Sequence, residues 1–182
     1  MISKEIDIRS AKSMGGIGAI LEIVGSWVPY LGYVLPLAGL VLVLLSLKRI
    51  SEATGKPTIF KDYLTSFIFM TIGNFLLVFV SGVTILSSFE KGFKIFHMGA
   101  SLFALLLAWV VVLIGAYFLR LSFNSVAEAT GVGMFETSAT LIFYGAISAI
   151  IFVGVLVFFV GKIIEVVAFY SLPDRLEVFN SS

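Results

Sequence analysis

The chain has 182 residues, of which 59% are hydrophobic and 13% are charged, and its mean hydropathy is +1.11. A soluble domain has about a quarter charged residues, so this composition indicates a multi-span membrane protein. The net charge of +1, without a block of like charge, argues against nucleic acid as a partner, and the lack of cysteine excludes disulfides and thiolate metal sites.

Residues 1–13 are polar and carry both acidic and basic groups, which predicts a cytoplasmic tail rather than a signal peptide. The apolar run that follows, residues 14–47, would form a helix of about 50 Å, far longer than a hydrocarbon core of about 30 Å. Its middle, residues 27–33, combines aromatic residues with Pro and Gly, as interfacial turns do. We therefore predict two spans, about residues 12–28 and 33–50.

Basic residues on both sides of this run support two crossings. One crossing would put the two groups on opposite faces of the membrane, whereas two crossings put both in the cytoplasm, as the positive-inside rule favours. The basic residues before the run are Lys4, Arg9 and Lys12, and those after it are Lys48, Arg49, Lys56 and Lys61.

Three further spans are predicted, at about residues 64–86, 98–120 and 138–161. Between the first two of these, residues 87–96 have aromatic residues at helical spacing with charges between them, which suits a short helix in the membrane interface. After the last span, residues 162–182 begin as an amphipathic tail. If residues 138–170 fold as two short spans, the protein has six crossings instead of five.

A tandem repeat organises these elements. Gly39–Gly55 and Gly115–Gly131 are identical at seven of seventeen positions, and both end in Glu-Ala-Thr-Gly. The repeat units are about residues 33–86 and 98–161. An even number of crossings separates the two loops, which predicts a parallel repeat with both loops on one side.

The repeated loops admit a structural and a functional interpretation. In the structural one, Gly55 and Gly131 terminate helices as C-caps, because glycine tolerates a positive φ. In the functional one, the recurring Glu52 and Glu128 form a paired cytoplasmic site for a cation or a partner.

Glu22 and Asn74 are the candidate intramembrane polar site. A carboxylate inside a span is costly, so Glu22 is a candidate proton or cation relay. Asn74 lies near the middle of the third span and is the candidate partner. For Glu22, the alternatives are a neutral acid that is hydrogen-bonded to a neighbouring helix, or a position closer to the membrane interface than the predicted span boundaries. For Asn74, the alternative is a role in helix packing.

Small residues predict close helix packing in two spans, with Gly15 and Gly18 in the first and Gly145 and Ala149 in the fifth. The glycines near residue 15 do not follow a strand and lack the spacing of a nucleotide-binding loop. His97 is the only histidine, and no catalytic motif occurs. We therefore expect no enzymatic activity, no metal and no cofactor.

The segments KSMGGIGAIL and LKRISEATGKPTIFKDYL resemble a family of small archaeal and bacterial integral membrane proteins that is catalogued as a domain of unknown function. This resemblance implies a membrane protein and no particular activity. The chain has no glutamine and three asparagines, which indicates either a thermophilic source or the exclusion of amides from apolar spans.

Together these features predict an all-α integral membrane bundle of about five helices, forming a single domain in the cell membrane. The leading functional prediction is an accessory or structural subunit that associates with other membrane proteins or with itself through small-residue faces. The alternative is a small transporter or channel component that uses Glu22 and Asn74.

Overall fold

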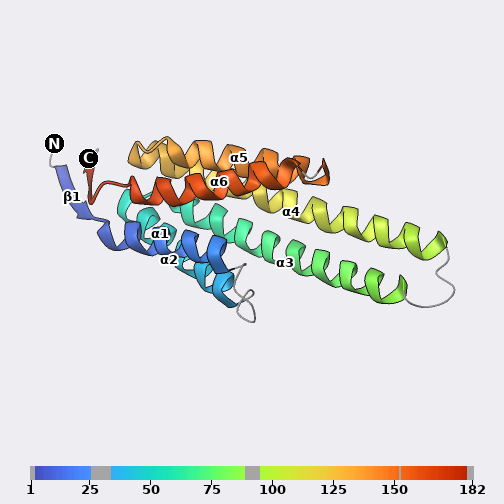
Figure 1. The fold of residues 1–182 in the computed structure, drawn as a ribbon. Coiled ribbons are helices and arrows are strands. Elements are labelled where there is room, and N and C mark those ends of the chain that lie inside the picture. Colours follow the sequence, from blue (N-terminus) through green and yellow to red (C-terminus); the bar gives the residue numbers. More distant parts are fainter. Residues whose placement is uncertain (1–2, 26–33, 89–94, 152, 180–182) are drawn as a thin grey trace.

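A computed structural model describes residues 3–25, 34–88, 95–151 and 153–179. These residues form a helix bundle, with one strand near each end of the chain (Figure 1). The elements are β1 (Ser3–Asp7), α1 (Arg9–Gly25), α2 (Val34–Thr54), α3 (Pro57–Ser88), α4 (Ile95–Thr130), α5 (Met134–Ser148), a 3₁₀ turn η1 (Ala149–Ile151), α6 (Val153–Tyr170) and β2 (Arg175–Phe179).

The helices associate as neighbouring pairs along the chain. The most extensive helix contacts join α3 with α4, α5 with α6, and α1 with α2. The middle pair is the longest: α3 has 32 residues and α4 has 36, which correspond to about 48 and 54 Å of helix. Figure 1 shows these two helices projecting together beyond the other four.

Among the described residues, five helices, α2 to α6, are long and apolar enough to cross a membrane, which makes the chain a multi-pass membrane protein. The number agrees with the prediction, but the set differs. The prediction counted the region of α1, which has 17 residues, and joined α5 and α6 into one span over residues 138–161. Its alternative, in which residues 138–170 fold as two short spans, is the arrangement that the structure has.

The division between α5 and α6 depends on a close backbone approach. Gly154 packs so closely on Ser148 and Ala149 that a Cβ there would overlap their backbone atoms. The chain therefore reverses at η1, and residues 162–170, predicted to begin an amphipathic tail, instead complete α6 and bury Glu165 and Phe169. The predicted interfacial helix at 87–96 falls mostly outside the described residues.

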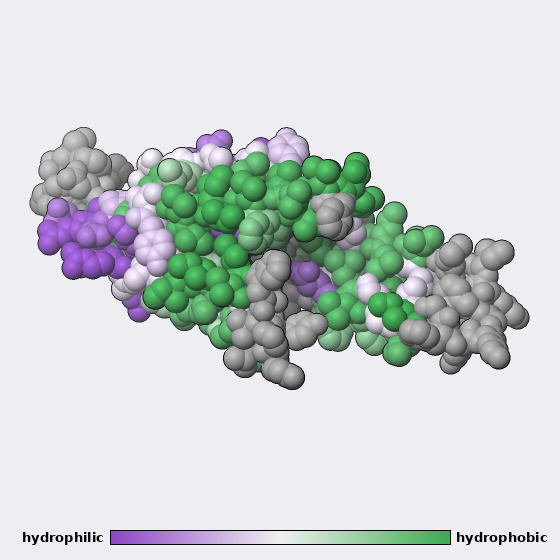
Figure 2. All heavy atoms as spheres, viewed as in Figure 1, coloured by the Kyte–Doolittle hydropathy of each residue, from purple (hydrophilic) through white to green (hydrophobic). Residues whose placement is uncertain are grey.

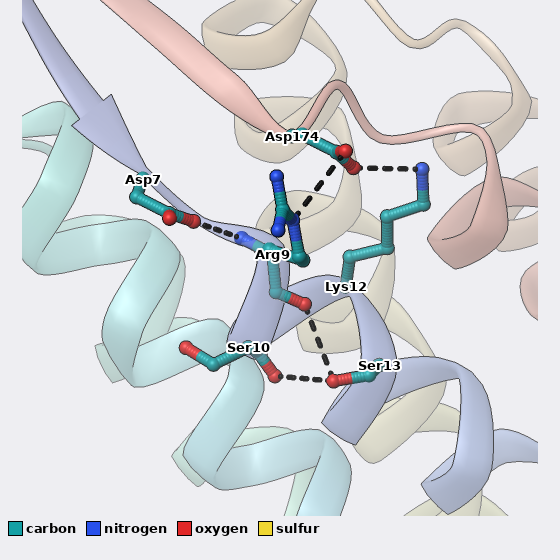
Figure 3. Close-up of polar contacts among 6 residues, drawn as sticks. All are labelled: Asp7, Arg9, Ser10, Lys12, Ser13 and Asp174. Atoms are coloured by element: carbon teal, nitrogen blue, oxygen red, sulfur yellow. Dashed lines mark hydrogen bonds and ion pairs between the residues drawn. The ribbon is translucent and has the colours of Figure 1, made fainter.

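The two ends of the chain pair with each other, which the prediction of a polar tail over residues 1–13 did not include. Strand β1 lies antiparallel to β2, with Asp7 opposite Arg175. Just before β2, Asp174 forms ion pairs with Arg9 at 3.5 Å and Lys12 at 3.3 Å (Figure 3). These contacts fasten the C-terminal strand to the start of α1.

Hydrophilic residues gather at the end of the molecule that contains β1, and apolar residues make up most of the helical surface seen in the same view (Figure 2). We call this the polar end. The helices α2 and α4 also finish there, at Gly55 with φ 67° and Gly131 with φ 73°. These positive values confirm the predicted glycine C-caps, because other residues rarely adopt this backbone conformation.

Below the polar end lies an aromatic core. The rings of Phe123, Phe135 and Phe169 are fully buried and meet edge to face, with centroids 5.0 to 6.4 Å apart. Two buried serines, which occupy equivalent positions in the predicted repeat, form hydrogen bonds between adjacent helices at this level. Ser46 Oγ donates to the carbonyl of Ala11 at 2.6 Å, and Ser122 Oγ donates to that of Ile59 at 2.7 Å.

Candidate functional site

Three charged side chains meet inside the bundle, and we call them the charge cluster: Glu22, Lys162 and Glu165. Lys162 Nζ lies 2.6 Å from Glu22 Oε2 and 2.5 Å from Glu165 Oε2. The exposed fractions of the side chains are 9% for Glu22, 13% for Lys162 and 0% for Glu165. One ammonium group therefore bridges two buried carboxylates.

The helix packing that brings α1 against α2 also fixes Glu22. A Cβ at Gly39 of α2 would lie 2.5 Å from the carbonyl oxygen of Gly18 and 3.0 Å from Glu22 Cγ. Only glycine leaves room for this approach of two backbones. On α6, Lys162 and Glu165 are three residues apart and hence share one face of the helix.

The level of the charge cluster follows from helix spacing. Gly15 of α1 packs against Phe169 of α6, in the aromatic core. Glu22 lies seven residues beyond Gly15, and Lys162 lies seven residues before Phe169. Both are therefore about 10 Å deeper in the bundle than the aromatic core, measured from the polar end.

The formal charges of the charge cluster sum to −1, since two carboxylates share one ammonium group. Within the described part of the chain, Glu165 Oε1 has no hydrogen-bond partner although it is buried. Buried charge of one sign is unfavourable, so the arrangement favours the uptake of one positive charge.

The prediction that Asn74 is the partner of Glu22 is wrong. Asn74 is exposed on α3, and its side-chain amide donates to the carbonyl of Met70 in its own helix at 2.8 Å. The partner that the structure provides, Lys162, was missed because it was assigned to the tail. A signal was present: Lys162 and Glu165 stand at helical spacing within a long apolar stretch.

Each of the repeated loop glutamates pairs with a lysine at the surface. Glu52 is 67% exposed and lies 4.0 Å from Lys48 of its own helix, whereas Glu128 is 73% exposed and lies 3.4 Å from Lys56. Exposed ion pairs of this kind contribute about 1 kcal/mol or less. The Lys56–Glu128 pair nevertheless joins the first loop to the helix that leads into the second.

The small residues predicted for helix packing make their contacts inside the chain. Gly15 and Gly18 of α1 meet α6 and α2, where added Cβ atoms would overlap Phe169 and Val43. Gly145 faces the backbone of Phe158 in α6, and Ala149 begins η1. The glycine faces of α1 and α5 are therefore already occupied by neighbouring helices of the same chain.

Comparisons with known proteins place the chain among proteins without an established role. The family model "Protein of unknown function (DUF996)" matches residues 35–163, a range that includes Lys162 and excludes both glutamates of the charge cluster. An uncharacterized protein from Methanocaldococcus jannaschii is 34% identical over 178 residues, which cover 97% of this chain and 99% of the relative. No solved structure matches the chain.

Proposed function

We propose that this chain, which belongs to the family of proteins of unknown function DUF996, is a small proton-carrying component of a membrane transporter or channel. Because the family has no established role, the proposal is argued from the charge cluster of the chain itself. One observation carries the proposal: two buried carboxylates share a single lysine inside a membrane protein. Ionisable groups at such positions commonly belong to ion pathways and proton relays.

The charge balance favours a proton as the ion. With Lys162 charged and both carboxylates ionised, the cluster carries −1, and one proton on either Glu22 or Glu165 makes it neutral. A proton carrier alternates between two such states of one site, a neutral state with the proton bound and an anionic state without it. In the neutral state, Lys162 stays paired with the carboxylate that remains ionised.

A metal cation fits the cluster less well than a proton does. Ca²⁺ and Mg²⁺ require about six oxygen ligands, and the described residues contain no group of three or more His, Cys, Asp or Glu side chains placed to hold a metal. The ammonium group of Lys162 also occupies the space between the carboxylate oxygens that a cation would use.

The polar end provides the nearer route for the proton. Lys162 lies eight residues before the end of α6, a rise of about 12 Å. We place this end in the cytoplasm and the helices in the cell membrane, because the basic residues concentrate here. They include Arg9, Lys12, Lys48, Arg49, Lys56, Lys61 and Arg175.

Proton flux into liposomes tests the proposal. The purified protein is reconstituted with a pH-sensitive dye inside the vesicles, and a potassium gradient with valinomycin drives protons inward. We expect flux with the wild type and its loss in Glu22→Gln and Glu165→Gln, which remove one acidic group each. The control, Glu52→Gln, makes the same chemical change at an exposed carboxylate and should leave the flux unchanged.

Two outcomes would contradict the proposal: wild-type vesicles that admit protons no faster than empty ones, and Glu22→Gln and Glu165→Gln variants that conduct as the wild type does. Size-exclusion elution and helical circular dichroism of each variant show whether it is folded before the flux is compared.

A second candidate function is an accessory subunit. The observation that favours it is the projection of α3 and α4 beyond the other helices (Figure 1). Both helices also carry exposed aromatic rings, those of Phe75, Phe79 and Phe103. A pull-down from the source membrane in mild detergent, followed by mass spectrometry, tests it. A stoichiometric partner that is lost when Phe75 and Phe79 are changed to Ala would support this function, and its absence would contradict it.

A further inference from the structure

A cationic site lies on the outer surface of the bundle, and it is independent of the charge cluster. The guanidinium carbon of Arg120, on α4, lies 5.5 Å from the ring centroid of Phe143 and 5.9 Å from that of Tyr144, both on α5. The ring of Tyr117 lies 6.4 Å from that of Phe143. We call these four residues the Arg120 site.

The guanidinium group lies over the faces of two aromatic rings, which offer it no hydrogen-bond acceptor. Within the described ranges, no carboxylate forms an ion pair with Arg120 and no hydrogen bond engages its side chain. A guanidinium group has five N–H donors in a planar fork, and that fork matches the oxygens of a phosphate. The site therefore presents an unsatisfied cation toward its surroundings.

The Arg120 site faces the membrane rather than another part of the chain. Tyr117 is 49% exposed and Tyr144 is 53% exposed, and the neighbouring Ile114 and Ile147 are also exposed. An apolar surface of this kind suits the acyl chains of a lipid.

The level of Arg120 matches the lipid headgroups. Ser122 of α4 donates to the carbonyl of Ile59 on α3, and these helices are neighbours of opposite direction. Arg120, two residues before Ser122, thus lies near the level of Lys61 and Asp62, where the charged part of α3 meets its apolar part. Tyrosine is enriched at this boundary of membrane proteins.

We propose that the Arg120 site binds the phosphate of an anionic phospholipid. The guanidinium edge donates to the phosphate oxygens in a charge-assisted, two-pronged contact. Phe143 and Tyr144 hold the plane of the guanidinium group in place, and the exposed isoleucines contact the acyl chain. The partner is a lipid and not free phosphate, because only a lipid has both the anion and the apolar chains that this surface fits.

Native mass spectrometry of the full chain in mild detergent tests the site, with phosphatidylglycerol as the anionic lipid and phosphatidylcholine as the net-neutral one. We expect the wild type to retain phosphatidylglycerol in preference. Arg120→Gln should weaken this binding about tenfold, the scale of one charge-assisted hydrogen bond. Lys61→Gln, which makes the same charge change at the same level, is the matched control and should leave it unchanged.

Two further measurements test the planar contact of Arg120 and distinguish a lipid from free phosphate. Arg120→Lys keeps the charge and should weaken binding about threefold, because lysine loses the planar fork and the stacking. Inorganic phosphate should not displace the lipid. The proposal is overturned if Arg120→Gln binds phosphatidylglycerol as the wild type does, if Lys61→Gln loses as much, if Arg120→Lys is unaffected, or if free phosphate competes.

Discussion

Replacing Lys162 by methionine removes the ammonium group while keeping an unbranched side chain of similar length. Lys162→Met leaves Glu22 and Glu165 buried without the cation that bridges them at 2.6 and 2.5 Å. Breaking a buried ion pair by removing one partner destabilises a protein by about 3–5 kcal/mol. We expect a loss of this size in the free energy of unfolding.

The chain contains a matched control on its surface. Lys56 pairs with Glu128 at 3.4 Å, and the two side chains are 41% and 73% exposed. Water and salt screen such a pair, so Lys56→Met should cost about 1 kcal/mol or less. The two variants make the same chemical change, and only the burial of the ion pair differs.

Reversible unfolding in mixed micelles, titrated with a denaturing detergent and followed by circular dichroism, measures both variants against the wild type. The triple variant Glu22→Gln, Lys162→Met, Glu165→Gln should recover most of the lost stability, because neutral side chains of similar size often replace buried ion pairs at little cost. If Lys162→Met and Lys56→Met differ by less than about 0.5 kcal/mol, the charge cluster is not the tightly buried site described here.

Three further predictions concern packing and the loops. Gly18→Leu should destabilise the chain by about 1–3 kcal/mol, since any side chain at Gly18 overlaps Gly39 and Val43 of α2; a thermal melt equal to that of the wild type would contradict this. Gly131→Ala should cost about 1 kcal/mol because its φ is 73°, and an unchanged melting temperature would be the contrary result. Asn74→Leu should leave both proton flux and stability nearly unchanged, because Asn74 bonds only to the carbonyl of its own helix; a loss of flux would restore Asn74 as part of the pathway.

The features that depend on local chemistry were predictable from the sequence. Composition predicts a helical membrane protein, since charged residues are too few for a soluble domain. The glycine that follows each Glu-Ala-Thr predicts a helix end, and both have a positive φ. The small residues of α1 and α5 predict close packing, and the structure shows which neighbour each one meets.

The features that depend on contacts between distant parts of the chain were not predictable from the sequence. The reversal between α5 and α6 lacks proline and charge, and it depends on the fit of Gly154 against Ser148, which no periodicity reveals. The sequence offered the reversal only as the alternative of two short spans over residues 138–170. The five-span prediction instead placed Lys162 and Glu165 in a tail, so it did not pair Lys162 with Glu22. The β1–β2 pair joins segments about 170 residues apart and follows from no local pattern.

The most direct test of the central claim is infrared difference spectroscopy of the reconstituted protein as the pH is changed. A carboxyl group that takes up a proton gains a C=O band characteristic of the acid, and the band shifts in deuterated water. The account predicts such a band in the wild type and in the control Glu52→Gln, and its loss in the double variant Glu22→Gln, Glu165→Gln. A spectrum in which the double variant keeps the band would show that the charge cluster does not carry the proton.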